Sequence, residues 1–315
     1  MAVILFTNLK GGVAKTTNAI AVAECLASSG KRTLLIDADH QCTASELLLG
    51  EQALIELDRK KRTLHDLLSE MLKPEFEAKQ FDAYVRPSAS NIGGGIEDLS
   101  VIPCSVRIDD FQTNYAKGGH GFHTWQDFRK LFNANRLQFR RWLKQFAYVI
   151  VDCPPSLSLQ VKLFLGIADG YVVPCQPNRL SIRGLLWLSD RIHNYRYKTV
   201  CLGTLWSMCR GNDRMHKAII EGAANNHAQL RDLPTPFETT VPLAANIAHA
   251  GELTDRQPKT FRAKYGTEFG RIYEQICEEL MERVEALESE RAEKRRGRPV
   301  TKVAASVASV VTARP

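Results

Sequence analysis

The sequence predicts an α/β fold in which a doubly wound, mostly parallel sheet is flanked by helices on both faces. A strand, a loop, a helix and a second strand follow one another within residues 2–37, which makes a βαβ unit with a right-handed crossover. Short apolar runs return at residues 148–151, 170–174 and 200–205. Their nearly continuous apolar character is typical of parallel strands that helices cover on both faces.

The first unit can be followed segment by segment. It consists of an expected strand at 2–7, a loop at 8–15, a helix at 16–29 and a strand at 32–37. Apolar residues recur at helical spacing in the third segment, and Gly30 follows it in the position of a helix C-cap. Residues 51–147 are more polar, so we expect helices and loops there that decorate the same domain.

The C-terminal part is expected to contain one long amphipathic helix. From Glu268 to Leu287 apolar residues recur every three or four positions, which predicts one face packed on the body of the domain. After Leu287 the apolar face stops and nearly every residue is charged. We therefore assign residues 1–288 to one domain and residues 289–315 to a basic, disordered tail.

The composition excludes some classes of protein and favours a polyanionic partner. No apolar run has the length that a membrane span needs, so we expect a cytoplasmic protein. The eight cysteines are scattered without a C-x-x-C pair, which argues against a disulfide framework. The net charge of +7 fits a protein that meets nucleic acid or an anionic membrane.

The loop between the first strand and the first helix has the residues of a phosphate-binding site. It reads Lys10-Gly11-Gly12-Val13-Ala14-Lys15-Thr16-Thr17. The glycines let backbone N–H groups approach phosphates, and the helix N-terminus adds partial positive charge. We expect Lys15 to reach the β- and γ-phosphates of ATP and Thr16 to place its hydroxyl on Mg²⁺. The standard pattern G-x-x-x-x-G-K-[ST] is not met, since Leu9 and Ala14 stand at its glycine positions.

Two further blocks follow, each at the end of an expected strand. Leu34 to Gln41 contains Asp37 and Asp39, and Tyr148 to Ser156 contains Asp152. With the loop, these blocks resemble the deviant Walker-A ATPases of the ParA/MinD (SIMIBI) class, most of all the ParA partition ATPases. The resemblance covers roughly residues 1–280 and implies a P-loop NTPase fold.

The chain departs from the family pattern at two positions. His40 stands where the D-x-D-P-Q block has proline, and it should alter the rigidity of the turn but not the chemistry. Ala14 stands where glycine usually precedes the lysine, and we expect it to take a negative φ as it enters the helix.

The resemblance also implies a role for each site residue. Lys10 would cross a dimer interface and contact the partner's nucleotide, in the manner of an arginine finger. Asp39 would orient the attacking water, while Asp37 and Asp152 would support the Mg²⁺ shell together with Thr16. Met208 and Pro242 would lie near the adenine. Without the resemblance, Lys10 would be interpreted as a solvated lysine and the aspartates as strand-end caps.

The implied function is a Mg-ATPase that forms a homodimer around ATP, binds DNA non-specifically and works with a ParB-like adaptor at the nucleoid. Candidate DNA contacts are the basic residues of the C-terminal part: Arg256, Lys259, Arg262, Lys264, Arg271, Arg295, Arg296 and Arg298. The segment Arg295 to Pro299 also matches the core of an AT-hook, which fits a narrow minor groove. An ordinary solvated helix face and tail would look the same.

Other members of this class remain as alternatives. A MinD-like membrane-cycling ATPase would need a C-terminal amphipathic helix with bulky residues, but residues 300–315 contain no Leu, Phe or Trp. A metal-cluster carrier would need paired cysteines. An ATPase that positions a protein cargo and a nucleotide-gated scaffold with little turnover stay open. We expect no membrane partner.

Overall fold

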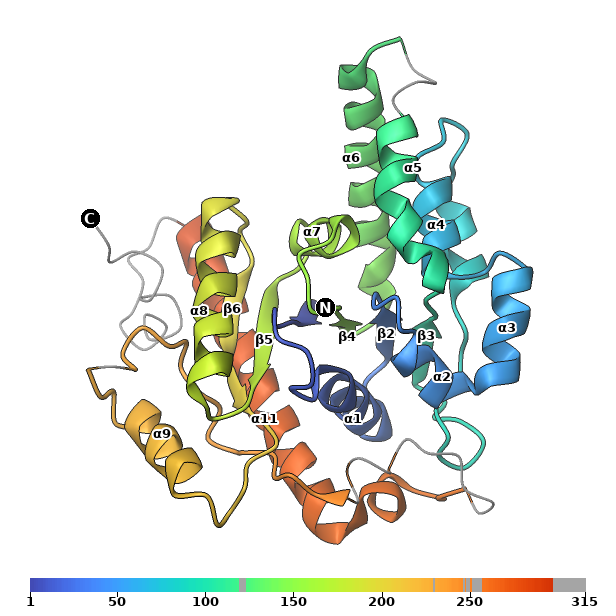
Figure 1. Cartoon of the computed structure of the whole chain (residues 1–315). Helices are drawn as coiled ribbons and strands as arrows, with labels where there is room; N and C mark the ends of the chain where they lie inside the picture. Colours follow the sequence, from blue (N-terminus) through green and yellow to red (C-terminus); the bar gives the residue numbers. More distant parts are fainter. Residues whose placement is uncertain (119–122, 229, 246, 248–249, 251–256, 297–315) are drawn as a thin grey trace.

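The computed structural model describes residues 1–118, 123–228, 230–245, 247, 250 and 257–296. In this part of the chain six strands form one sheet in the order β3-β2-β4-β1-β5-β6. They are β1 (Ala2–Phe6), β2 (Thr33–Asp37), β3 (Leu99–Ile102), β4 (Tyr148–Asp152), β5 (Gly170–Cys175) and β6 (Val200–Trp206). Every neighbouring pair runs parallel, so the predicted doubly wound α/β fold is confirmed (Figure 1).

The sheet is wound in both directions from its centre. The crossover after β1 passes through α1 (Lys15–Ser28) to β2, whereas the crossover after β4 passes through α7 (Leu159–Leu165) to β5 on the other side. Open α/β sheets bind ligands at such a switch point, just outside the carboxyl ends of the strands. The phosphate loop follows β1, so the fold places it at that position.

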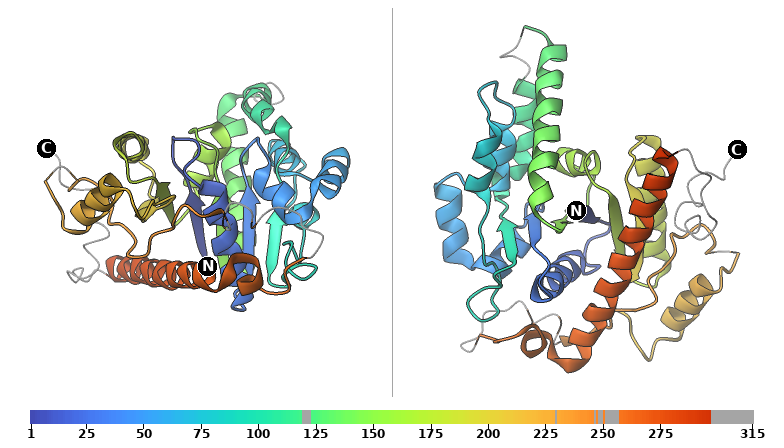
Figure 2. Two further views of the ribbon diagram at one scale, coloured as in Figure 1. Left: turned by 60° about the horizontal axis from the view of Figure 1, so that its bottom comes forward. Right: turned by 180° about the vertical axis from the view of Figure 1, so that it is seen from behind.

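The two faces of the sheet carry separate hydrophobic layers. In β1, Ile4 and Phe6 belong to the layer under α1 and α11 (Phe261–Arg295), while Val3 and Leu5 belong to the opposite layer. This alternation is the period of two that a strand imposes. The opposite layer is built with α4 (Leu64–Glu70), α6 (Trp125–Trp142), α7 and α8 (Arg179–Asn194). Figure 2 shows α11 along the back of the sheet.

The remaining elements lie around the edges. They are α2 (Thr43–Leu49), α3 (Glu51–Arg59), η1 (Ala78–Tyr84), η2 (Val106–Asp110), α5 (Phe111–Gly118), η4 (Leu143–Gln145) and α9 (Arg214–Ala224). Helices α5 and α6 project from the body as a pair (Figure 1). None of the described helices has both the length and the apolar character that a membrane span requires.

Two of the expected elements need correction. Residues 51–147 contain strand β3, not helices and loops alone, because the four residues Leu99–Ile102 pair with β2 and complete that side of the sheet. The long helix begins at Phe261, has a non-helical residue at Gly266 (φ 78°) and reaches Arg295.

The prediction that residues 289–295 belong to a disordered tail is therefore wrong. Arg291 holds this last part of α11 in place, since its Nη1 donates to Asp169 Oδ1 at 2.7 Å. Glu290 is buried and pairs with Lys294 one turn later. Residues 297–315, which include most of the AT-hook match, lie outside the described residues.

Candidate nucleotide site

The phosphate loop is attached to the neighbouring strand by Asn8. The side chain of Asn8 is fully buried, and its Nδ2 donates to the carbonyl of Pro174 in β5 at 2.8 Å. Its Oδ1 accepts the backbone N–H of Lys10 at 3.0 Å. Asn8 thus fixes where the loop turns, a role that sequence reasoning missed. The sequence indicates this role of Asn8 only by placing a polar residue between an apolar strand and the first glycine.

The loop backbone passes through left-handed conformations at two positions. Gly12 has φ 66°, and a Cβ added at Gly11 or Gly12 would meet no atom within 4 Å. Ala14 has φ 60° and ψ 33°, so the prediction of a negative φ there is wrong. The closure of the loop onto α1 sets this conformation, and an alanine pays about 1–2 kcal/mol for it relative to the right-handed region.

Lys15 is buried between the loop and the strand ends. Its side-chain Nζ donates to the carbonyl of Lys10 at 3.0 Å, and only 7% of the residue is exposed. Burial lowers the pKa of Lys15, while the charges of Asp152 and Asp39 act in the opposite direction. The expected phosphate lysine and two of the expected acidic residues therefore belong to one electrostatic cluster.

Asp37 and Asp152 lie side by side on neighbouring strands. They are direct register partners at the ends of β2 and β4, and both are fully buried. Asp37 is well satisfied, because Oδ2 accepts from the N–H and the hydroxyl of Ser45 at 2.8 and 2.6 Å. Burial nevertheless raises the pKa of Asp37 to about 6.

Asp152 is a buried carboxyl group whose two oxygens lack a hydrogen bond of normal geometry. Burial raises its pKa well above the ordinary value, and the neighbouring Asp37 adds to the rise. The Thr16 hydroxyl lies close enough to oppose that rise. A buried carboxylate without partners is expensive, so this group marks a position where a cation would be favourable.

Asp39 lies on the loop that follows β2. Its N–H donates to Asp37 Oδ1 at 3.1 Å, and its own Oδ1 accepts from the N–H of Gln41 at 3.1 Å. His40 Nδ1 lies 3.5 Å from Asp39 Oδ1 and 3.8 Å from Asp109 Oδ1. The residue that replaces the family's proline therefore contacts the expected water-orienting carboxylate.

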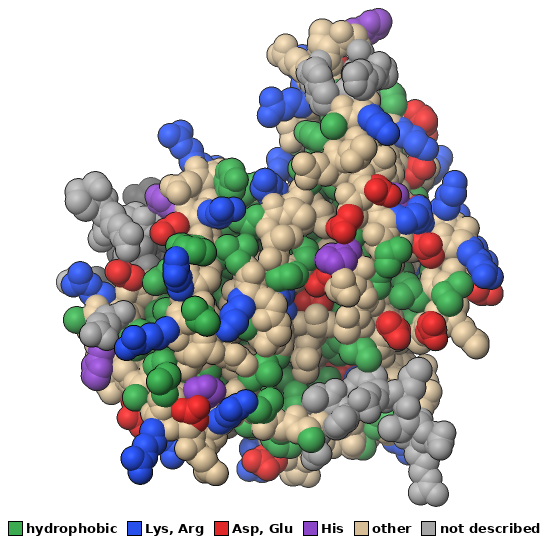
Figure 3. Space-filling model, viewed as in Figure 1, with side chains coloured by type: hydrophobic (Ala, Val, Ile, Leu, Met, Phe, Trp, Pro, Cys, Tyr) green, Lys and Arg blue, Asp and Glu red, His purple; other side chains and the backbone are tan. Residues whose placement is uncertain are grey.

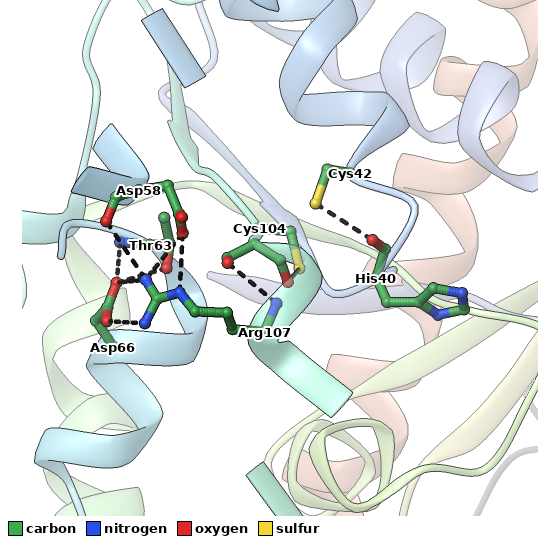
Figure 4. Close-up of polar contacts among 8 residues, drawn as sticks. His40, Cys42, Asp58, Thr63, Asp66, Cys104 and Arg107 are labelled. Carbon is green, nitrogen blue, oxygen red and sulfur yellow. Dashed lines mark hydrogen bonds and ion pairs between the residues drawn. The ribbon is translucent and has the colours of Figure 1, made fainter. Parts of the chain in front are cut away.

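A second polar network supports the neighbouring helices. Figure 4 shows Arg107 of η2 between Asp58 of α3 and Asp66 of α4, with His40 and Cys42 on the nearby loop. Arg107 Nη2 lies 2.8 Å from Asp58 Oδ1, and Nη1 lies 3.0 Å from Asp66 Oδ1. This network joins η2, α3 and α4, so it holds the elements beside the Asp39 loop and has no direct part in the site.

Lys10 lies along helix α8 in the single chain. Its Nζ donates to Ser181 Oγ at 3.0 Å. Asn178 caps the helix and accepts the N–H of Ser181 at 2.9 Å, which sets the position of the hydroxyl. A Cβ added at Gly184, one turn further, would lie 3.9 Å from the Cβ of Lys10. The second lysine of the loop is thus held apart from Lys15.

The structure brings the expected adenine residues together. Met208 follows β6 with φ 55°, and its Sδ accepts from Gln176 Nε2 at 3.3 Å. The next residue, Cys209, forms a parallel bridge with Pro242. Met208 and Pro242 therefore lie close together beyond the carboxyl ends of β5 and β6.

The structure places the described candidate DNA contacts in different environments. Lys264 is excluded, because its side chain is 1% exposed and its Nζ lies 2.7 Å from buried Glu24 Oε1. Arg262 is exposed but already pairs with Glu274 through two hydrogen bonds of 2.9 and 2.8 Å. The others that the structure describes are exposed: Lys259, Arg271, Arg295 and Arg296. Arg256 and Arg298 lie outside the described residues.

The sequence matches known proteins over most of this site. The AAA domain family matches residues 1–200. The chromosome partitioning protein ParA of Caulobacter vibrioides is 30% identical over 197 residues, which are 62% of this chain and 64% of that protein. The sporulation initiation inhibitor protein Soj of Bacillus subtilis is 28% identical over 194 residues, 60% of this chain and 64% of that protein. The chain thus matches less than two thirds of the length of these relatives.

Solved structures share the fold over nearly the whole chain. An ATP complex of a Cyanothece McdA variant has a TM-score of 0.63 at 19% identity, covering 90% of this chain and 96% of that one. A putative plasmid partition protein of Borrelia burgdorferi bound to AMPPNP has a TM-score of 0.61 at 17% identity. The match covers 89% of this chain and 98% of that one. A cobyrinic acid a,c-diamide synthase of Mycobacterium smegmatis with ADP and magnesium has a TM-score of 0.59 at 20% identity. The match covers 95% of this chain and 97% of that one.

Proposed function

Because the chain belongs to the AAA domain family of ParA-type P-loop ATPases, we propose that it is a Mg-ATPase that dimerises around ATP and partitions DNA. In this proposal the ATP-bound dimer binds DNA non-specifically at the nucleoid, and a ParB-like adaptor stimulates its turnover. Chromosome and plasmid partition are the tasks named for two of the similar proteins, which supports DNA as the cargo.

One observation carries the proposal: the two oxygens of the buried Asp152 carboxylate accept no hydrogen bond of normal geometry. This group lies next to Asp37 at the strand ends, where its charge acts on Lys15 of the glycine loop. These residues fit a bound Mg²⁺, which would be held by Thr16, Asp37 and Asp152. Magnesium usually keeps several waters and takes only one or two carboxylates, with substrate phosphates as further ligands.

Each residue of the site then has a task. Mg²⁺ would neutralise charge on the β- and γ-phosphate oxygens. The N–H groups of Gly11 to Thr17 would surround the phosphates, and Lys15 would leave the Lys10 carbonyl to bind them. Asp39 would orient the attacking water, because phosphoryl transfer depends mainly on positioning and charge stabilisation.

Lys10 would act on the partner's nucleotide in the dimer. It would leave Ser181 and add positive charge where negative charge spreads in the transition state. Met208 and Pro242 would contact the adenine. The DNA contacts would come from Lys259, Arg262, Arg271, Arg295 and Arg296, with Arg256 and Arg298 as further candidates.

The proposal is tested by measuring retention on duplex DNA with ATP, with ADP and without nucleotide. We expect retention with ATP only, no ATP binding by Lys15→Ala, and persistent ATP-dependent retention by Asp39→Ala. A protein ending at Arg296, which keeps the whole of α11, separates the contribution of the remaining tail. Retention that does not depend on nucleotide would contradict the proposal. ATP binding without turnover, even with DNA and adaptor, would favour the scaffold alternative.

A further inference from the structure

A large groove lies away from the phosphate loop, between helices α8 and α9. Its volume is about 1570 Å³. Ile182 and Leu186 of α8 form one wall, Ala218 and Ile219 of α9 form the other, and Tyr171 and Leu202 lie at the floor. The lining contains none of the residues assigned to nucleotide or Mg²⁺, so the groove is a separate feature.

Bulky apolar side chains remain exposed at the rim of this groove. Trp187 of α8 is 53% exposed and Met215 of α9 is 60% exposed, and both line it. Single exposed apolar residues are ordinary, but a group of them around a concave surface marks an interaction site. Tryptophan and methionine are also among the residues enriched at protein interfaces.

The same rim is positively charged. Arg179 and Arg183 are exposed one turn apart on α8, in line with Trp187, and in the described part of the chain neither pairs with a carboxylate. The guanidinium of Arg183 lies 4.4 Å from the ring centroid of Trp187, so cation and aromatic ring form one surface. Arg231 also lines the groove, whose lining includes the acidic residues Asp190 and Asp232 as well. Figure 3 shows Lys and Arg side chains over α8 and α9.

We propose that this groove, lined by α8 and α9, binds an acidic segment of a partner protein that carries bulky apolar anchors. The apolar walls would take the anchors, and Arg179 and Arg183 would pair with the carboxylates. The apolar lining favours a polypeptide over nucleic acid, because a nucleic acid surface is typically basic along its floor as well. The proposal does not depend on ATP hydrolysis.

The position of α8 also gives the groove a route to the nucleotide site. The inner side of this helix contacts Lys10 through Ser181 and Gly184, while Arg183 and Trp187 lie on its outer side. A segment bound in the groove would therefore rest on the helix that holds Lys10. A partner that docks here is placed to influence whether Lys10 leaves Ser181.

The test uses a fluorescent synthetic peptide with leucine at every third or fourth position and glutamate elsewhere. A matched peptide has lysine in place of glutamate. Binding to the full chain is measured by fluorescence anisotropy without nucleotide. We expect the acidic peptide to bind, and Trp187→Ala or Arg183→Glu to weaken it by about tenfold or more, which is about 1.4 kcal/mol. Leu137→Ala and Arg141→Glu, at exposed positions of α6, are the matched controls.

Several outcomes would overturn the proposal. The α6 variants could weaken binding as much as the α8 variants, or the lysine peptide could bind equally well. Duplex DNA could displace the peptide and lose affinity for the Trp187 and Arg183 variants, which would make the groove a nucleic acid site. A photo-reactive amino acid at position 215 could crosslink to a second copy of the chain instead of the peptide. A protein that binds the acidic peptide but hydrolyses no ATP would contradict the proposed function and leave the proposed peptide site standing.

Discussion

Asp37 and Asp152 are register partners at the ends of β2 and β4, so two fully buried carboxyl groups face the same edge of the sheet. Only Asp37 has hydrogen-bond donors, and Asp152 has none of normal geometry. In the nucleotide-free protein, ionisation of this buried pair is therefore unfavourable in free energy, and a bound cation would offset that penalty.

This cost predicts how stability depends on pH. Burial raises the pKa of Asp37 from 3.8 to about 6, and the pKa of Asp152 is raised further. The folded state then binds more protons than the unfolded state, so stability is highest below about pH 4 for these groups and falls as pH rises toward 6. For Asp37 the loss is at most about 3 kcal/mol. Thermal unfolding of the nucleotide-free protein, followed by circular dichroism across this range, measures it.

Replacing Asp152 by asparagine should remove much of this cost. We expect Asp152→Asn to stabilise the nucleotide-free protein at pH 7.5 by about 1–2 kcal/mol, because a buried amide costs less than a buried charge. The same variant should lose the increase in melting temperature that Mg·ATP gives the wild type. Asp190→Asn, at an exposed position of α8, should change neither quantity. A destabilised Asp152→Asn protein would mean that the carboxylate is satisfied in a way that the structure does not record.

The left-handed conformation of Ala14 leads to a third prediction. Ala14→Gly removes the Cβ that disfavours φ 60°. We expect the free energy of unfolding to rise by about 1 kcal/mol, partly offset because glycine also gains freedom in the unfolded chain. Urea unfolding measures the change, and Ala134→Gly within α6 is the control that should destabilise by a similar amount. If both variants lose stability, the strain at Ala14 is absent.

Much of the fold could be predicted because its signals are local. The apolar runs that became β1, β2, β4, β5 and β6 are short and nearly continuous, and the glycine loop lies directly between a strand and a helix. Strand β3 was not predicted because it has only four residues and lies in a polar region. Its pairing with β2 depends on tertiary contacts that a local pattern does not show.

The errors in the site concern contacts between distant segments. Lys264 lies in a polar stretch and looks exposed in the sequence, but Glu24 lies 240 positions away and pairs with it. The φ of Ala14 follows from closing the loop between Asn8 and α1, which no local propensity records. The hydrogen bond from Lys10 to Ser181 spans 171 positions, so it could not be predicted from the local sequence either.

Lys10 gives a fourth prediction, which separates ATP binding from dimer-dependent hydrolysis. Because its Nζ binds Ser181 and Lys15 occupies the loop, Lys10→Ala should leave ATP binding by the single chain largely intact. Hydrolysis stimulated by DNA and adaptor should fall by at least about a hundredfold, as expected for loss of a charge that acts in the transition state. Lys31→Ala, an exposed lysine after α1, is the control. Normal turnover by Lys10→Ala would contradict the cross-subunit role.

The buried ion pair between Lys264 and Glu24 gives the last prediction. Glu24 of α1 accepts from Lys264 Nζ at 2.7 Å, from Ser90 Oγ at 2.6 Å and from Tyr265 OH at 2.8 Å. Lys264→Met leaves the Glu24 charge buried without its counterion, so we expect a loss of about 3–5 kcal/mol in the free energy of unfolding. Adding Glu24→Gln should recover a large part of it.

DNA binding distinguishes this structural role from the surface role that the sequence suggested for Lys264. Wherever the Lys264→Met, Glu24→Gln protein stays folded, its ATP-dependent DNA affinity should match that of the wild type, because Lys264 does not reach the surface. The matched change at exposed Lys259, Lys259→Met, should have the opposite profile: unchanged stability and, if Lys259 contacts phosphates, weaker DNA binding with a shallower dependence on salt. A folded double variant that bound DNA poorly would show that the helix start at Phe261 moves to expose Lys264 when the protein meets DNA.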